Sequence, residues 1–166
     1  MAAARIDRIE EQPEATARLM AWRRAEKHGD RAAAQAAGKA VYLVAWNGAE
    51  PVGHVFVKWP GELSSKRAAM EACVEIEDLY VRSDKREQGV GDALLAAAEE
   101  EAQARGFDRI GLAVGLENEP ALRLYGRRGY ADSGHGVFTL TWTSRDEAGR
   151  ERQVREDCRY LVKSLA

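Results

Sequence analysis

The sequence has few cysteines, no long apolar run and no leader-like N-terminus, and each absence argues against a class of protein. Cys73 and Cys158 are its two cysteines. Without a CxxC pair or a Cys/His cluster, they argue against a disulfide framework and against zinc. The segment 40–46 is about the longest strongly apolar stretch, far short of the roughly 20 residues that cross a bilayer. Charge enters at Arg5, before any signal-peptide core. We therefore expect a soluble cytoplasmic protein with no metal and no membrane contact.

An excess of charge of one sign is also absent. The 25 Lys and Arg residues nearly balance the 27 Asp and Glu residues, and the net charge is −2. This balance argues against sequence-independent binding to nucleic acid. Two local imbalances remain, because the stretch 71–78 is acidic without a basic residue and 123–128 holds arginines without an acidic residue. The first stretch suits a cation and the second an anion.

Several common catalytic and nucleotide-binding motifs are missing as well. No segment supplies the Gly-x4-Gly-Lys-Ser/Thr of a P-loop or the Gly-x-Ser-x-Gly elbow of a serine hydrolase. The dinucleotide fingerprint needs glycine or alanine three residues after Gly91, where the chain has Leu94. The histidines show no ligand spacing, so we assign them no chemistry.

A glycine-containing turn is present between a strand-like segment, 74–81, and an alanine- and leucine-rich helical pattern. It reads Arg86-Glu87-Gln88-Gly89-Val90-Gly91. Gly89 and Gly91 remove two side chains where a ligand would approach the main chain, and the helix that follows offers unpaired N–H groups and the positive end of its dipole. The turn therefore predicts an anion-binding site.

Local patterns predict alternating strands and helices in one domain, 1–166. The expected elements are a strand at 5–10, helices at 13–27 and 30–37, a hairpin of 41–46 with 52–58 across Asn47-Gly48, a loop or short helix in 60–72, a strand at 74–81, a helix at 89–105, a strand at 109–114, a helix from Pro120 to Gly129, and strands at 137–143 and 157–163 joined by the long polar connection 144–156. Residues 74–114 then form a βαβ unit whose two strands run parallel.

The strand at 74–81 carries an irregularity. Its apolar residues fall at Val74 and Ile76 and then at Leu79 and Val81, so their parity changes across Glu77-Asp78. A one-residue bulge explains the change. The alternative is a central strand that is buried on both faces and ignores parity.

Two signatures in this order resemble the GNAT family of N-acetyltransferases. The turn 86–91 matches the pattern Arg/Gln-x-x-Gly-x-Gly/Ala, and 118–130 resembles Asn-x-x-Ala-x-x-Leu-Tyr-x-x-x-Gly-Phe/Tyr. The order of the predicted elements is similar to the family's as well. The resemblance implies an α/β fold with a mixed, mostly antiparallel sheet of about seven strands, a parallel βαβ acyl-CoA-binding core and helices on both faces.

The resemblance also implies a set of residues that bind acetyl-CoA as co-substrate. The main chain of the strand would hold the thioester and the pantetheine, with Asn118 contacting the same arm. The residues assigned to this binding are Leu79, Tyr80, Val81, Arg86, Glu87, Gln88, Gly89, Val90, Gly91, Asp92 and Asn118. Arg86 is alternatively a solvated loop charge, and the arginines of 123–128 either meet the nucleotide phosphates or form a solvated helix face.

Glu77 and Tyr125 are the expected catalytic residues. Glu77 lies in a segment similar to the strand of polyamine-type GNAT enzymes, whose glutamate takes a proton through water, and Tyr125 occupies the position of the family's tyrosine acid. The alternatives are that Glu77 is a polar residue that attracts cations at a bulge and that Tyr125 is a core aromatic. Glu75 is a weaker candidate for the base.

These residues together predict direct acetyl transfer from acetyl-CoA to a primary amine. The acidic stretch 71–78 favours a cationic small-molecule acceptor. A protein lysine or N-terminus is the alternative acceptor, and a CoA-binding module with little turnover or another nucleotide-binding protein are the alternative classes. The resemblance further implies a homodimer as an assembly state.

Overall fold

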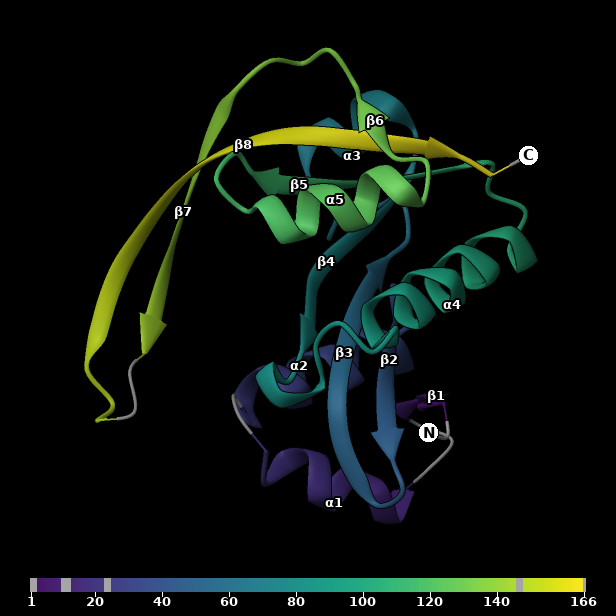
Figure 1. Ribbon diagram of the computed structural model, residues 1–166. Helices are drawn as coiled ribbons and strands as arrows, with labels where there is room; N and C mark the ends of the chain where they lie inside the picture. The colour runs from purple at the N-terminus through teal and green to yellow at the C-terminus, as the bar shows by residue number, and fades with distance from the viewer. Residues whose placement is uncertain (1–2, 10–12, 23–24, 146–147, 166) are drawn as a thin grey trace. The chain divides into compact units, whose positions relative to one another are not determined.

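The computed structural model describes residues 3–9, 13–22, 25–145 and 148–165 (Figure 1). The elements are β1 (Arg5–Arg8), α1 (Pro13–Met20), α2 (Ala25–Ala36), β2 (Ala40–Asn47), β3 (Glu50–Lys58), α3 (Lys66–Glu71), β4 (Val74–Val81), the 3-10 turn η2 (Ser83–Lys85), α4 (Val90–Ala104), β5 (Arg109–Gly115), α5 (Glu119–Arg127), β6 (Ala131–Asp132), β7 (Phe138–Arg145) and β8 (Glu151–Ser164). The chain divides into two compact units, 1–110 with 164–166 and 111–163, and each is described by itself.

In the first unit, β1 to β4 pair antiparallel in chain order. The hairpin predicted around Asn47-Gly48 is confirmed, since Asn47 pairs with Glu50 and Gly48 has a φ of 62°. The predicted βαβ unit is also confirmed, because α4 connects β4 to the start of β5, its neighbour in the sheet. Among the described residues the strands are mostly antiparallel with a parallel pair, which is the predicted mixed α/β class.

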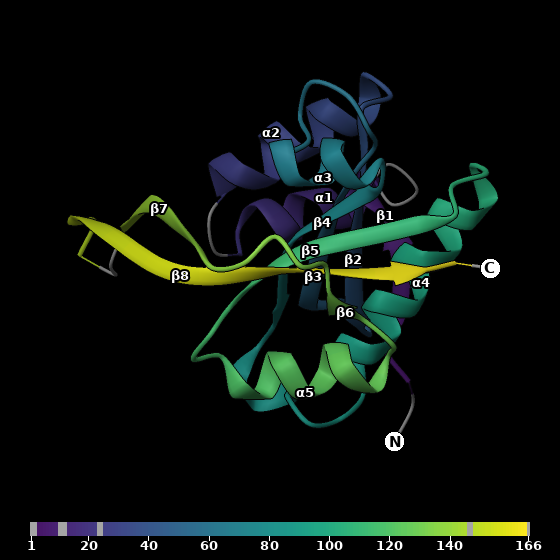
Figure 2. The ribbon, with the colours of Figure 1, turned by 90° about the horizontal axis from the view of Figure 1, so that it is seen from above.

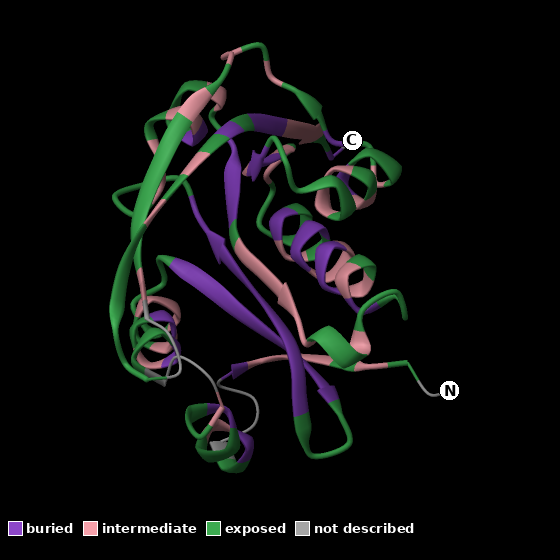
Figure 3. Ribbon diagram, turned by 60° about the vertical axis from the view of Figure 1, so that its left-hand side comes forward, coloured by how far each residue is buried: buried purple, intermediate pink, exposed green. Residues whose placement is uncertain are grey.

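Helices cover both faces of the first unit's sheet (Figure 2). Tyr42, Val44 and Trp46 on alternate positions of β2 pack with α1 and α2 in one hydrophobic core. On the other side lies α4, whose alanine- and leucine-rich pattern forms a buried stripe of Leu94, Leu95, Ala98 and Ala102. Figure 3 shows the buried face of this helix. The helix approaches closely at Gly53, where an added Cβ would lie 3.1 Å from Leu94 Cδ1 and 2.8 Å from the Tyr80 carbonyl oxygen. Only glycine fits there without a shift.

The predicted bulge in β4 is confirmed. His54 pairs with Tyr80 and Phe56 pairs with Glu77, so an interval of two residues in β3 faces an interval of three in β4. Asp78 is the residue with an unusual backbone, at a φ of +53°. Glu77 and Tyr80, three residues apart, therefore face the same side of the sheet, the side of α1 and α2.

The prediction for the first two helices was wrong in its boundaries. The expected stop at Gly29 is absent, because α2 runs through Gly29 and α1 already ends at Met20. Glycine inside a helix costs only about 1 kcal/mol relative to alanine. His28 and Arg31 beside it are buried, and tertiary packing of this kind outweighs a local penalty.

In the second unit, α5 begins after Asn118, and the predicted antiparallel hairpin is formed by β7 and β8. The long connection predicted over 144–156 was wrong, since Arg145 still pairs with Glu151. Polar residues continue both strands because these positions are exposed on the hairpin and need no apolar face. The two-residue strand β6, which pairs with β8, was not predicted. No helix in the described part of the chain is long and apolar enough to cross a membrane.

We expect the Asp78→Ala substitution to lower the free energy of unfolding by about 2 kcal/mol, because it leaves the buried Arg31 guanidinium without its carboxylate partner. The two groups lie 2.8 Å apart, and the partial exposure of Asp78 reduces the effect below that of a fully buried pair. Urea denaturation measures the change. Asp84→Ala, which removes an exposed partner of Arg82, is the matched control, and equal effects of the two substitutions would contradict the expectation.

Candidate functional site

The turn before α4 has a backbone suited to a bound anion. Gly89 is the N-cap of α4 with a φ of 86°, and no side chain caps this helix end. Glu87 also has a left-handed backbone, at a φ of 61°. Inside the turn, the side-chain Nε2 of Gln88 donates a hydrogen bond to the Asp84 main-chain carbonyl at 3.1 Å, which braces the loop. The conformation is therefore fixed by the chain itself.

The residues of this turn fit a diphosphate group. The amides of Val90, Gly91 and Asp92 belong to the first turn of a 15-residue helix, where main-chain N–H groups have no partner within the helix and the dipole favours an anion. An added Cβ on Gly89 would meet nothing within 4 Å, so the main chain is open to a ligand. Glu87 and Asp92 carry carboxylates, which restricts their contribution to main-chain amides.

Arg86 is held against the end of β4. Its Nε donates to the Val81 carbonyl at 3.0 Å, and its guanidinium carbon lies 5.8 Å from the centre of the Tyr80 ring. Arg86 is thus an exposed residue whose side chain contacts the end of β4, and its terminal nitrogens supply further donors. The structure brings the predicted strand residues Leu79, Tyr80 and Val81 and the predicted turn together in the first unit.

The acidic stretch 71–78, which has no basic residue of its own, is paired with bases from other parts of the chain. Three of its acids have a basic partner from another part of the chain: Arg109 lies 2.6 Å from Glu71, Lys58 lies 2.9 Å from Glu75, and Arg31 lies 2.8 Å from Asp78. The side chain of Glu77 is half exposed and lies 3.4 Å from Lys58. Glu77 is therefore the member of the stretch best placed to meet a solvent-borne substrate.

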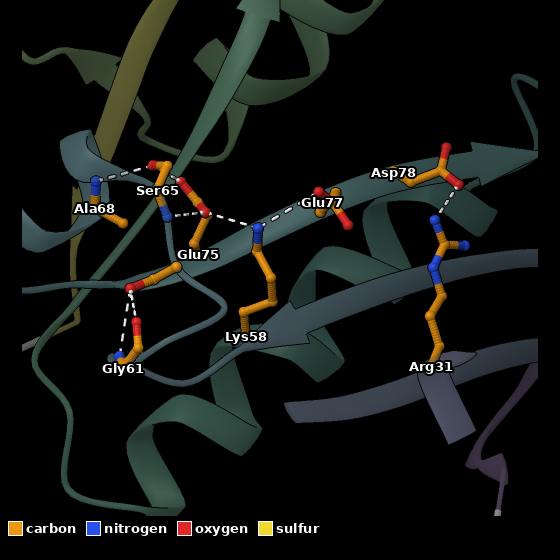
Figure 4. Close-up of polar contacts among 9 residues, drawn as sticks. Arg31, Lys58, Gly61, Ser65, Ala68, Glu75, Glu77 and Asp78 are labelled. Carbon is orange, nitrogen blue, oxygen red and sulfur yellow. Dashed lines mark hydrogen bonds and ion pairs between the residues drawn. The ribbon is translucent and has the colours of Figure 1, made fainter. Parts of the chain in front are cut away.

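Glu75 lies on the same face as Glu77, because the bulge follows both residues (Figure 4). It is buried and accepts hydrogen bonds from the Ser65 amide at 3.0 Å and from the Ser65 hydroxyl. Burial raises the pKa of Glu75, but the attraction of Lys58 and the bonds from Ser65 together bring that pKa below its ordinary value. Glu75 is buried and both of its oxygens accept hydrogen bonds from Ser65, so it has little room for a substrate proton. The half-exposed Glu77 is therefore the candidate base.

In the second unit, Asn118 and Tyr125 lie on α5 and its N-terminus. Asn118 is the N-cap, with its Oδ1 accepting from the Ala121 amide at 3.3 Å. Its side-chain nitrogen is the atom with donors suited to a pantetheine amide. Tyr125 is buried, with its ring 5.8 Å from that of Tyr130 in an edge-on arrangement.

The sequence analysis missed a cluster of rings in the first unit. His28 and His54 are buried, and both pack against Trp22. The His28 Nδ1 lies 2.7 Å from the Tyr42 hydroxyl, and Arg31 lies 5.4 Å from the Tyr42 ring centre. Their positions in the sequence gave no spacing signal, because α2, β2, β3 and the bend after α1 supply them. No group of three His, Cys, Asp or Glu side chains in the described ranges could hold a metal ion.

Known protein families and structures resemble this chain in the region that holds the turn and the bulged strand. The sequence profile of the Acetyltransferase (GNAT) family matches residues 4–130, most of the chain. The chain belongs to this family. The matched region includes β4, the turn 86–91 and α5.

Curated relatives and a solved structure are similar to this GNAT chain. An uncharacterized N-acetyltransferase of Methanocaldococcus jannaschii is 34% identical over 85 residues, which is 50% of this chain and 35% of that protein. The aminoalkylphosphonate N-acetyltransferase of Salmonella typhimurium is 42% identical over 65 residues, 39% of this chain and 42% of that protein. The matches thus span less than half the length of either relative.

A GNAT acetyltransferase from Elizabethkingia anophelis, solved with acetyl-CoA bound, has the same fold. It covers 99% of both chains with a TM-score of 0.63 at 16% identity. Identity at this level shows the fold alone.

We expect Gly89→Ala to lower the free energy of unfolding by about 1 kcal/mol, because alanine is strained at a positive φ although there is space for its Cβ. The methyl group should also weaken CoA binding, as measured by calorimetry, because it lies on the main chain that would face the diphosphate. Gly126→Ala in α5 is the matched control with the opposite sign, since alanine is favoured inside a helix. Unchanged stability and affinity in Gly89→Ala would contradict the proposed geometry.

The lowered pKa of Glu75 makes its contribution to stability dependent on pH. A group whose pKa is lower in the folded state stabilises the fold above its unfolded pKa and loses that contribution as the pH falls through the folded value. The difference in unfolding free energy between the wild type and Glu75→Gln should therefore be largest near neutral pH and shrink below about pH 4.5. Urea denaturation at pH 7 and at pH 3.5 measures it, and a constant difference would contradict the prediction.

Proposed function

We propose that this chain is an N-acetyltransferase that moves an acetyl group from acetyl-CoA directly to a primary amine. The observation that carries the proposal is the uncapped, glycine-started N-terminus of α4, directly after a bulged strand that bears a half-exposed glutamate. The first feature suits the diphosphate of CoA, and the second suits an amine that must lose a proton. We further propose that both units form one domain, 1–166, because the family match crosses their boundary.

Glu77 is the proposed base. An alkylammonium with a pKa of about 10.4 must spend ~4.6 kcal/mol at pH 7 to present a nucleophilic lone pair. Glu77 takes this proton, directly or through water, while the nitrogen forms a bond to the thioester carbon. The main chain at Leu79, Tyr80 and Val81 would hold the thioester and the pantetheine.

Tyr125 is the proposed acid. When the carbon–sulfur bond breaks, the CoA thiolate needs a proton, and a phenol with a pKa near 10 faces a thiol with a pKa near 8.5, a mismatch of only ~2 kcal/mol. Asn118 would contact the pantetheine arm, while Arg86, Glu87, Gln88, Gly89, Val90, Gly91 and Asp92 would hold the diphosphate through the turn.

The proposed acceptor is a small molecule with a cationic amine. Glu77 supports this choice as the half-exposed carboxylate of the site, whereas the paired acids around it lend little additional attraction. The name of the Salmonella typhimurium relative identifies a small amine as that protein's substrate. A protein lysine or N-terminus is the second candidate acceptor. A homodimer stays a prediction of the family resemblance, and a cytoplasmic location stays a prediction of the cysteine content and the N-terminal sequence.

A thiol-release assay with acetyl-CoA and a panel of polyamines, aminoglycosides, amino acids and peptides tests the function. We expect turnover with at least one small amine, and a fall in kcat of about 10²-fold or more in Glu77→Gln and in Tyr125→Phe, as for other general acids and bases. Glu62→Gln, on the exposed side chain paired with Lys39, is the matched control.

Two results would count against the proposal. Binding of CoA without acetylation of any amine would favour a CoA-binding module, and competition between CoA and ATP for the turn would favour another nucleotide-binding protein. A peptide accepted in preference to every small amine would move the acceptor to the protein class.

A further inference from the structure

Lys58 is a buried lysine that lies between two carboxylates (Figure 4). Its Nζ is 2.9 Å from an oxygen of Glu75 and 3.4 Å from an oxygen of Glu77. A buried ammonium needs a compensating charge, and the buried Glu75 already supplies one. The second contact, to the half-exposed Glu77, is therefore not needed to compensate the charge of Lys58.

The position of Lys58 is fixed by Glu75, which is itself held by Ser65. Glu75 accepts hydrogen bonds from the Ser65 amide and hydroxyl, besides the ion pair with Lys58. The Ser65 hydroxyl in turn accepts from the Ala68 amide at 3.2 Å as the N-cap of α3. Glu75 is thus anchored to α3, and it anchors the lysine.

The register of β3 and β4 directs the ammonium toward Glu77. Lys58 pairs with Glu75 and Phe56 pairs with Glu77, so Lys58 reaches its second carboxylate along the diagonal of the ladder. Glu77 is the last residue before the bulge at Asp78. Its side chain would otherwise be free to rotate at a half-exposed position.

The geometry points to Lys58 as the positioning residue for Glu77, an inference that rests on the proposed function. The ammonium holds one carboxylate oxygen and leaves the other for the proton of the amine or of a bridging water. Holding the side chain in one rotamer beforehand removes an ordering cost from the reaction. A chain of contacts from Ser65 through Glu75 and Lys58 then connects the start of α3 to the base.

The test compares Glu75→Gln with the double variant Lys58→Met/Glu75→Gln. The double variant removes the buried pair together, which avoids an unpaired buried charge, and methionine is close to the lysine stem in size. Relative to Glu75→Gln, we expect the double variant to lose about tenfold to a hundredfold in kcat, with KM for acetyl-CoA unchanged. Lys58→Arg in the Glu75→Gln background should restore part of kcat. Lys39→Met, on an exposed lysine paired with Glu62, is the matched control.

The outcomes distinguish a failure of the proposed role of Lys58 from a failure of the proposed acetyltransferase function. If the wild type acetylates an amine and the double variant keeps the kcat of Glu75→Gln, Lys58 has only a structural role and this inference is overturned. If the wild type acetylates no amine, the proposed function fails and the inference fails with it.

A second measurement covers the case in which the double variant does not fold. The ¹⁵N resonance of the Lys58 ammonium should move in Glu77→Gln and stay unchanged in Glu62→Gln. A Lys58 signal that does not respond to Glu77→Gln would overturn the inference without any assay of turnover.

Discussion

The bulge at Asp78 changes which side chains of β4 face α1 and α2. Without the extra residue, Tyr80 would point to the opposite face, the side on which Leu94 of α4 already lies close to Gly53. The left-handed backbone of Asp78 costs about 1 kcal/mol or more. Its ion pair with Arg31, which also packs over Tyr42 and Phe56, opposes that cost. The candidate base and the strand segment assigned to the thioester depend on this irregularity.

Buried ion pairs flank the bulge, and net stability alone does not explain their presence. Removing two charges from water offsets much of the attraction between them, and apolar replacements are often as stable. Arg31 with Asp78 and Lys58 with Glu75 fix positions instead, because each cation has its carboxylate partner at a defined place on β4. Such pairs resist a shift in register, which would place a buried charge against an apolar face. The half-exposed Glu77 lies between them in the sequence and is the most exposed acid of the stretch.

The parts of the fold that could be predicted are those whose signals lie within a few residues. The Asn47-Gly48 hairpin, the strand at 74–81 with its bulge, and the stripe of α4 all depend on local chemistry and side-chain parity. The boundary at Gly29 failed because burial of its neighbours outweighs a local propensity. The ion pairs of the acidic stretch 71–78 could not be predicted for a related reason. The partner of Asp78, Arg31, lies 47 residues earlier, and nothing in the sequence alone brings the two together.

Two parts of the first unit's candidate site, the turn 86–92 and the surroundings of Glu77, therefore differ in how well they can be predicted from sequence. The turn 86–92 acts through main-chain amides and needs little more than Gly89 and a helix start, so a short pattern is enough to recognise it. The surroundings of Glu77 are assembled from β3, β4, α2 and α3, and each contributes a residue that has no motif of its own. Chains that share the turn can consequently differ at Lys58 or Arg31 without losing the CoA pattern. Under the proposed function, the residues around the bulge would discriminate among acceptor amines, and the shared turn would carry little information about them.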